Sequence, residues 1–445
     1  MNIVLIISDT CRRDHLGCYG NSWIHTPHLD RLAEQAIVFD HCYAASFPTI
    51  PNRSDILTGR YNFTYLGWTP LPPDEITLPH LLSDAGYLTS AIADTPFYMR
   101  NGYGYDRGFS EFVWVHGQGL LHERVYQDAV RDRRKEDDHF AAKTMRTAER
   151  WLEQHRKDPF FLVVDTWDPH EPWDPPGHYV ELYREDQNGP PSVMPPYWYW
   201  EEAGLSADDV ENAHAHYCGE ITMVDRAVGR LLERLESLGL TENTAVIFTA
   251  DHGFYFGEHG ILGKGLIYRG ADPVEWHRCP LYDEITRIPL MIRLPQTEPK
   301  RVDALVTSPD LMPTILQLAG AAVPRTVQSE SLVPLLEGKD TQPHPFVVTS
   351  WPLHDLYFKL KVVDDVARTT TEALPTTITD GLWTLICSVE GAPVELYDMV
   401  ADPKQEHNVL EGNDGIARGL HAGLVQFLEQ VGTPERFIAP RRHLL

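Results

Sequence analysis

Residues 46–60 read SFPTIPNRSDILTGR and predict a loop that leads into a helix. Two prolines restrict the backbone on either side of Thr49, Asn52 is a favourable helix N-cap, and Gly59 marks the expected helix end. Thr49 would then sit just before a helix N-terminus, where free N–H groups and the helix dipole favour an anion, with Arg53 one turn later. This combination suits phosphoryl or sulfuryl transfer. The ordinary alternative is a proline-rich loop before a structural helix.

The composition narrows the class of protein. The chain has 445 residues, enough for one large α/β domain and a smaller one. Its formal net charge of −26 argues against nucleic acid or an anionic membrane as a partner, because both attract basic surfaces. The six cysteines show no C-x-x-C pair or zinc spacing and predict reduced thiols. With an apolar strand starting at residue 2 and no run of about 20 apolar residues, we expect a cytoplasmic protein without a signal peptide or membrane span.

Polar side chains follow several apolar runs that are typical of buried parallel strands. These runs lie at 2–8, 89–94, 160–165 and 245–250. Ligands bind at the carboxyl ends of strands in such sheets. The residues placed at or just beyond those ends are Asp9, Thr95, His170, Asp251 and His252. Two carboxylates and an imidazole suit a divalent ion, whereas a turn cap at Asp9 and a surface-loop histidine at His170 are the plain alternatives.

Four segments resemble the sulfatase family of the alkaline phosphatase superfamily. PNRSDILTGR at 51–60 is similar to the family signature C/S-x-P-S-R-x-x-x-L-T-G-R, and DTCRRDHLGCYG at 9–20 to its first metal motif. DPHEP at 168–172 is similar to the segment of a substrate-contacting histidine, and TADHG at 249–253 to the second metal motif. This order of motifs is that of the family across nearly the whole chain.

The resemblance implies an α/β fold with a large mixed, mostly parallel sheet sandwiched by helices, as in alkaline phosphatase, and a smaller C-terminal α+β subdomain. Residues 1–340 would form the catalytic domain. A proline-containing connection would lead into the subdomain, 341–445, with a small antiparallel sheet and a terminal helix. The segment 174–206, rich in Pro, Trp and Tyr, would wall the pocket with aromatic rings or pack on the body.

The resemblance also assigns roles to single residues. One divalent ion (Mn, Ca, Mg or Zn) would be bound by Asp9, Thr49, Asp251 and His252. The catalytic residues would be Thr49, Arg53, His170 and Lys264, and Thr95 would contact the substrate. The substrate would be a small anionic ester. The sequence leaves its identity, the metal and the oligomeric state open, a homo-oligomer included.

Three positions depart from the family pattern. Thr49 stands where a cysteine or serine is oxidised to formylglycine, Asn52 where a serine or another small residue is usual, and Thr10 where many members have a second aspartate. Phosphonate monoester hydrolases and related phosphodiesterases also lack that aspartate. The first hypothesis is therefore a metal-dependent hydrolase of phosphodiesters or phosphonate monoesters with a threonine nucleophile. The alternatives are a sulfatase acting on sulfate esters and an inactive sulfatase-like binding protein.

Overall fold

The computed structural model describes residues 1–96, 102–119, 123–185, 194–268, 275–353, 375–389 and 393–444. Its main element is an eight-stranded sheet with the order β13-β2-β12-β7-β1-β5-β3-β4. The strands are β1 (Asn2–Ser8), β2 (Ile37–Tyr43), β3 (Leu88–Ala93), β4 (Glu111–Trp114), β5 (Phe160–Thr166), β7 (Thr244–Ala250), β12 (Arg287–Arg293) and β13 (Lys300–Thr307). β12 pairs antiparallel with β2 and β7, and the other pairs are parallel. The predicted mixed, mostly parallel sheet is confirmed.

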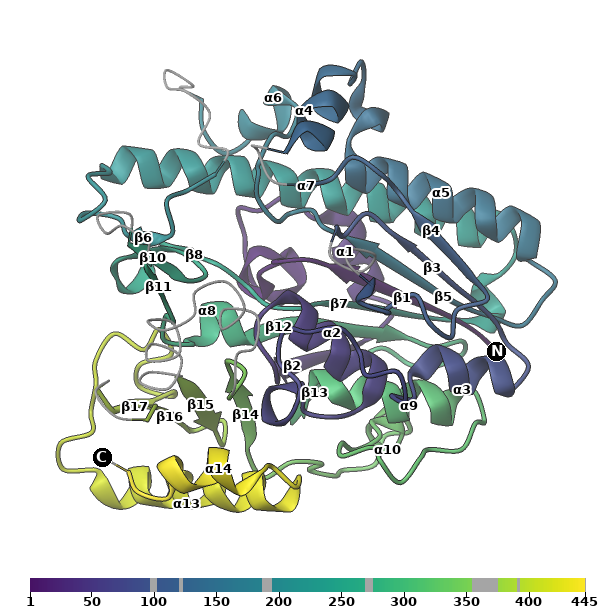
Figure 1. Ribbon diagram of the computed structural model, residues 1–445. Helices are drawn as coiled ribbons and strands as arrows, with labels where there is room; N and C mark the ends of the chain where they lie inside the picture. Colours follow the sequence, from purple (N-terminus) through teal and green to yellow (C-terminus); the bar gives the residue numbers. More distant parts are fainter. Residues whose placement is uncertain are drawn as a thin grey trace.

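The centre of the sheet follows directly from the apolar runs in the sequence. Every residue of β1, β5 and β7 is buried, as expected for parallel strands that are covered on both faces. Helices α1 (Pro27–Ala33), α5 (Phe140–His155) and α7 (Ala207–Ser237) cover one face (Figure 1). The other face carries α2 (Thr49–Thr58), α3 (Leu78–Asp84) and α9 (Leu311–Leu318). The predicted sandwich of helices is therefore confirmed.

Shorter elements complete the large part of the molecule. The remaining helices are α4 (Arg124–Arg131), α6 (Gly177–Val180), α8 (Asp283–Thr286) and α10 (Val333–Leu336). One small sheet joins β6 (Trp198–Tyr199), β9 (Ile261–Gly263) and β8 (Tyr255–Phe256), and another joins β10 (Leu266–Tyr268) and β11 (Glu275–His277). The first of these sheets brings part of the aromatic segment 174–206 against the loop that follows β7. Residues 186–193 of that segment lie outside the described residues.

Helix α2 begins earlier than the sequence predicts. The expectation that Asn52 is the N-cap is wrong, because Pro48 occupies that position and Asn52 lies inside the first turn. The backbone N–H of Asn52 donates to the carbonyl of Pro48 at 3.1 Å. Pro51 is tolerated there because the first helical turn needs no N–H from it. Gly59 ends the helix as predicted, with φ of 64°, a conformation that glycine adopts without steric cost.

The C-terminal part has its own antiparallel sheet, with the strand order β14-β15-β16-β17. Its strands are β14 (Val347–Ser350), β15 (Thr376–Thr379), β16 (Trp383–Cys387) and β17 (Glu395–Asp398). Helix α13 (Asp414–Gln430) packs on β15 and β16, and α14 (Glu435–Ile438) follows it. The predicted α+β subdomain is confirmed. The boundary at residue 340 stays a prediction and falls between α10 and β14.

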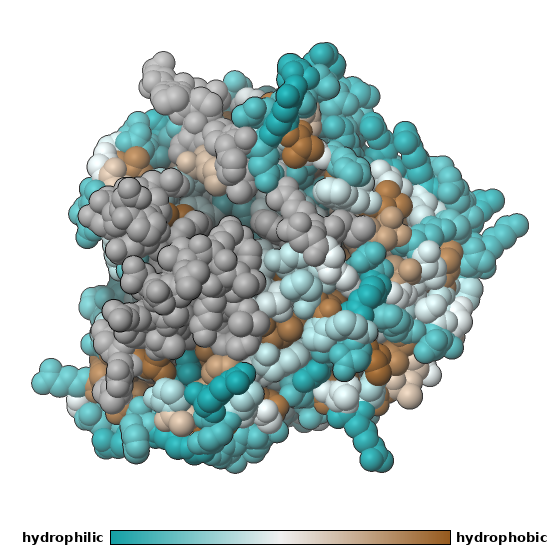
Figure 2. Space-filling view, in the orientation of Figure 1, coloured by the Kyte–Doolittle hydropathy of each residue, from teal (hydrophilic) through white to brown (hydrophobic). Residues whose placement is uncertain are grey.

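The surface and the thiols agree with the composition. All six cysteines are free, as predicted. Among the described residues, we find no helix that combines the length and the apolar character of a membrane span. The face drawn in Figure 2 is mainly hydrophilic among its coloured residues, with hydrophobic groups in small, separate patches.

Candidate active site

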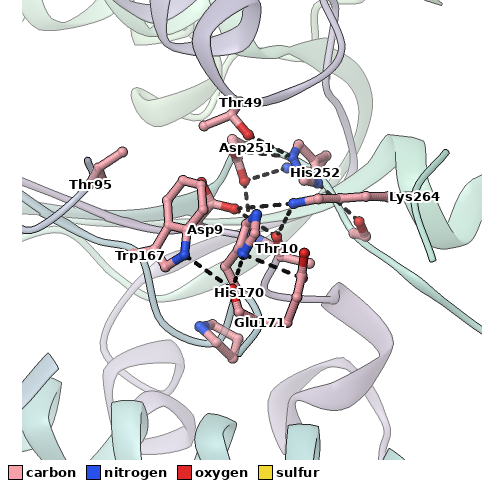
Figure 3. Close-up of polar contacts among 12 residues, drawn as sticks. Asp9, Thr10, Thr49, Thr95, Trp167, His170, Glu171, Asp251, His252 and Lys264 are labelled. Carbon is pink, nitrogen blue, oxygen red and sulfur yellow. Dashed lines mark hydrogen bonds and ion pairs between the residues drawn. The ribbon is translucent and has the colours of Figure 1, made fainter. Parts of the chain in front are cut away.

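The carboxyl ends of β1 and β7 bring three predicted metal ligands together. Asp9 follows β1, while Asp251 and His252 follow β7, its neighbour in the sheet. Their ligand atoms lie within 4.8 Å of one another, and none of the three side chains is exposed to solvent. Figure 3 shows them facing a common point. The parallel pairing therefore places two carboxylates and an imidazole, as predicted, at one edge of the sheet.

The electrostatics of this group favour a bound cation. Burial and the neighbouring Asp251 raise the pKa of Asp9 well above its usual range. Asp9 Oδ2 is buried without a hydrogen-bond partner; Arg53 Nη1 lies 3.0 Å away, but as an ion pair outside hydrogen-bond geometry. Arg53 Nη1 also contacts Asp251 Oδ2 and offsets part of the repulsion between the two buried carboxylates, and a cation held by both carboxylates would offset more of it. The donor set fits a divalent ion of hard or borderline character.

Thr49 lies beside these ligands at the start of α2. Its Oγ1 is 3.3 Å from His252 Nε2, and its side chain is buried. Burial lowers the pKa of His252 to about 3, so the imidazole is neutral. His252 Nδ1 is 3.0 Å from the carbonyl of Gly253 and donates to it. Nε2 is then an acceptor that faces the threonine hydroxyl.

Arg53 contacts Asp9 and Asp251, and its guanidinium is fully buried. Its Nε and Nη2 donate to the two oxygens of Asp165 at 2.9 and 2.8 Å. Nη1 donates to Asp251 Oδ2 at 2.5 Å. Arg53 is therefore held by carboxylates, and its predicted catalytic role stays a prediction. Asp165 was missed from the sequence, although a carboxylate near the end of the apolar run FFLVVDT is a signal for it.

Lys264 reaches the group from the loop after β9. Its Nζ donates to Thr10 Oγ1 at 3.2 Å and lies 3.9 Å from Asp9 Oδ1. Thr10 Oγ1 in turn donates to Asp9 Oδ1 at 2.6 Å. The sequence marked Thr10 only as a missing carboxylate, whereas its hydroxyl connects Lys264 to Asp9. Lys264 is thus placed with the predicted ligands.

The backbone of Thr10 is also held in an unusual conformation. Its φ of 60° lies in the left-handed region, which costs energy for a β-branched residue. The N–H of Thr10 donates to Asp251 Oδ1 at 2.9 Å, and its carbonyl accepts from the Tyr217 hydroxyl at 2.8 Å. Strand β7 and helix α7 therefore both fix the turn that carries Asp9.

His170 is buried beside a carboxylate that the sequence did not single out. Its ring stacks on Trp167 with 3.6 Å between centroids. Nδ1 donates to the carbonyl of Glu171 at 2.6 Å and lies 3.3 Å from Glu171 Oε2. Burial and Lys264 lower the pKa of His170 well below its usual range. Tyr197, from the aromatic segment, donates its hydroxyl proton to Glu171.

Thr95 is placed differently from the other predicted residues. It lies to one side of the group in Figure 3. Its hydroxyl donates to Asp165 Oδ1 at 2.5 Å, and its side chain is fully buried. Thr95 therefore connects to Arg53 through Asp165. Its predicted contact with the substrate stays a prediction.

Known proteins share both the sequence pattern and the fold. The family model described as Sulfatase matches residues 1–321, and the model described as N-sulphoglucosamine sulphohydrolase, C-terminal, matches residues 275–430. An ulvan-active sulfatase of Formosa agariphila is 27% identical over 432 residues, covering 92% of this chain and 77% of its own. An N-acetylglucosamine-6-O-sulfatase of Bacteroides thetaiotaomicron is 26% identical over 430 residues, covering 77% of this chain and 72% of its own.

A solved structure supports the fold independently. The phosphonate monoester hydrolase of Agrobacterium radiobacter superposes with a TM-score of 0.78 at 22% identity, covering 97% of this chain and 96% of that chain. At this identity the likeness concerns the fold. The Sulfatase model, in contrast, spans most of the sequence and all the strand ends described above. The chain therefore belongs to the sulfatase family of ester-hydrolysing enzymes.

Proposed function

We propose that the protein hydrolyses phosphodiesters or phosphonate monoesters, with Thr49 as the nucleophile and one divalent metal ion as cofactor. The observation that supports this is the position of Thr49 Oγ1, at the N-terminus of α2 and 3.3 Å from His252 Nε2. In sulfatases that use formylglycine, the hydrate collapses to expel sulfate. Threonine has a single hydroxyl and cannot collapse in this way. An ester on threonine must instead be released by water, which suits attack at phosphorus.

Sulfatase-family enzymes use a divalent metal ion, and the residues present fit one. Asp9, Asp251 and His252 would hold it, with Thr49 Oγ1 as a further ligand. Such an ion lowers the pKa of a bound hydroxyl and polarises an oxygen of the substrate. Carboxylate, imidazole and hydroxyl ligands suit Mn, Mg, Ca or Zn.

Thr49 and the side chains around it would have separate roles in the reaction. Thr49 Oγ1 forms a bond to phosphorus as the bond from phosphorus to the leaving oxygen breaks, and the threonine proton passes to solvent. Lys264 would neutralise charge on the substrate oxygens, and Arg53 keeps the carboxylates of the site in place. Water then cleaves the Oγ1–P bond and restores the hydroxyl.

His170 would act on the leaving group. Its pKa is lowered by burial and Lys264, so His170 is neutral in the protein alone. An anionic ester bound beside it raises that pKa. His170 would then protonate the leaving alkoxide or, as the neutral imidazole, position it.

A substrate panel tests the proposal. The metal-loaded protein is assayed with bis-p-nitrophenyl phosphate, p-nitrophenyl phenylphosphonate and p-nitrophenyl sulfate. We expect phosphorus esters to dominate, with Thr49→Ala at least about 10³-fold slower and Thr49→Ser retaining part of the activity. Mass spectrometry of acid-quenched protein should find a phosphoryl or phosphonyl group on Thr49. Unchanged turnover in Thr49→Ala with metal still bound would exclude threonine catalysis.

The sulfatase alternative is supported by the sulfatases that are similar to this chain. Dominant turnover of p-nitrophenyl sulfate by the unmodified Thr49 protein would favour it over a phosphoesterase. Thr49→Cys is a useful comparison, because it restores the family's cysteine before Pro51 and Arg53. Once that cysteine is oxidised to formylglycine, we expect the preference to move toward the sulfate ester. A metal-loaded protein that turns over none of the three esters would support the inactive, binding-only alternative.

A further inference from the structure

We propose that His15, His214 and Cys218 form a second metal site, separate from the Asp9 group, that takes a thiophilic divalent ion such as Zn²⁺. Their ligand atoms lie within 4.8 Å of one another. His15 and Cys218 are buried, and His214 is partly buried. Two imidazoles and a thiolate form a ligand set that prefers zinc and its neighbours over magnesium or calcium.

The local structure brings these side chains together from two elements. His214 and Cys218 are one turn apart on α7, so they share a helix face. His15 lies on the short 3-10 helix Arg13–His15, in the loop that follows β1. Its Nε2 is 2.6 Å from Nε2 of His214. The two nitrogens therefore face each other directly.

Asp14 sets the tautomer of His15. Its Oδ1 lies 2.9 Å from His15 Nδ1 and accepts the hydrogen from it. Arg12 fixes Asp14 by donating from Nε and Nη2 to its two carboxylate oxygens, at 2.8 and 2.5 Å. In the neutral ring, His15 Nε2 then presents a lone pair toward His214. A carboxylate that orients a histidine in this way is the usual outer partner of a metal-binding histidine.

The two imidazole nitrogens require little adjustment to hold an ion, and Cys218 Sγ lies within 4.8 Å of them. In a tetrahedral zinc site, the metal–nitrogen distance is about 2.0–2.1 Å and the metal–sulfur distance about 2.3 Å, so ligand atoms lie about 3.3–3.6 Å apart. The two Nε2 atoms would separate by less than about 1 Å from their present 2.6 Å. Three protein ligands leave the fourth position to water.

Aromatic rings surround much of the cluster, and the Arg12–Glu258 ion pair lies near His214. The rings of Trp23, Tyr217 and Phe256 pack against His15 or His214, with centroid distances of 4.6 to 6.4 Å within this cluster. Trp23 is 49% exposed and marks the side nearest the solvent. A bound ion would therefore cross-link helix α7 to the loop that carries Asp9 and His15.

Cobalt substitution tests the second site without any assay of catalysis. The full chain is freed of metal, titrated with Co²⁺, and followed by the thiolate-to-cobalt charge-transfer absorption, which the ligands of the Asp9 group cannot produce. We expect about one thiolate-bound cobalt per chain. Cys218→Ala and His214→Ala should abolish or strongly reduce the band. Cys42→Ala, at a buried cysteine of β2, is the matched control and should keep it.

Zinc analysis gives a second readout. Wild type and Cys42→Ala should each retain about one more zinc per chain than Cys218→Ala, with circular dichroism confirming that all are folded. If Cys218→Ala fails to fold, the partly exposed His214→Ala decides. The proposal is overturned if wild type shows no thiolate band, or if the band survives in His214→Ala. His15 and His214 would then form only a hydrogen bond inside an aromatic cluster.

Discussion

The loop after β1 carries two clusters of potential metal ligands with different chemistry. Asp9, at its start, joins Asp251 in an oxygen-rich group that is bordered by Arg53 and Lys264. His15, six residues later, joins a nitrogen and sulfur cluster among aromatic rings. The first environment suits a hard or borderline ion and an anionic ligand, and the second suits a thiophilic ion. Position along a loop therefore says little about chemistry until the partners from other elements are known.

Asp251→Asn gives the sharpest separation of the two clusters. It removes one carboxylate of the oxygen-rich group, and we expect kcat/KM for the best phosphorus ester to fall about 10³-fold or more. The thiolate–cobalt absorption should persist, because Asp251 is not a ligand there. Asp303→Asn, which alters an 89% exposed carboxylate, is the control and should retain activity. Loss of the cobalt band in Asp251→Asn would show that the clusters depend on each other.

Asp165→Asn tests whether buried charge holds the oxygen-rich group together. Asp165 pairs with Arg53 through two hydrogen bonds, and both side chains are buried. Asp251 and Asp9 still face Arg53 in this variant, but its two charge-assisted hydrogen bonds to Asp165 are lost inside the core, so urea unfolding should show a loss of about 3–5 kcal/mol. Asp137→Asn breaks a partly exposed pair with Arg230 and should cost less than about 1 kcal/mol. Equal losses in the two variants would contradict this account.

His344, which lies outside both clusters, allows a test with a smaller expected effect: the pH dependence of stability. Burial opposes its protonation, but Asp310, within 3.0 Å, outweighs burial and raises the pKa of His344 in the folded state. The resulting stability is fully present below about pH 6.5, the unfolded value, and is lost as pH rises through the raised folded pKa. His344→Gln should thus lose about 1 kcal/mol at about pH 5.5 and less at about pH 9.

Urea unfolding at the two pH values measures this difference. His178→Gln, at a histidine whose side chain is 59% exposed, is the matched control and should show no such trend. A stability gap for His344→Gln that grows with pH would reverse the predicted sign. That outcome would show that the ion pair between His344 and Asp310 does not stabilise the folded protein at low pH.

The sequence predicts the centre of the fold well and its edges poorly. Strands β1, β5 and β7 are apolar throughout because both of their faces are covered, so their composition alone reveals them. The edge strand β13 and its neighbour β2 mix polar and apolar residues, as KRVDALVT and IVFDHCY show. Their pairing depends on long-range contacts that no local pattern encodes.

The same contrast holds within the site. Residues that follow a buried strand, such as Asp9 and Asp251, could be located because the sheet brings strand ends to one edge. Asp165 also lies near the end of a buried strand, but its role, like that of Glu171, depends on which side chain faces it across the fold. The Asn52 cap failed for a similar reason, since Pro48 supplied the first helical carbonyl. The His15 cluster needs the register of α7 against a loop about two hundred residues earlier in the chain.

The threonine at the start of α2 has a consequence for how the protein would acquire its nucleophile. A formylglycine nucleophile exists only after a cysteine or serine of the chain has been oxidised. With Thr49 as the proposed nucleophile, the encoded side chain already carries the attacking hydroxyl and needs no such oxidation. Under the proposed mechanism, the activity of the protein would therefore not depend on whether its host can make formylglycine.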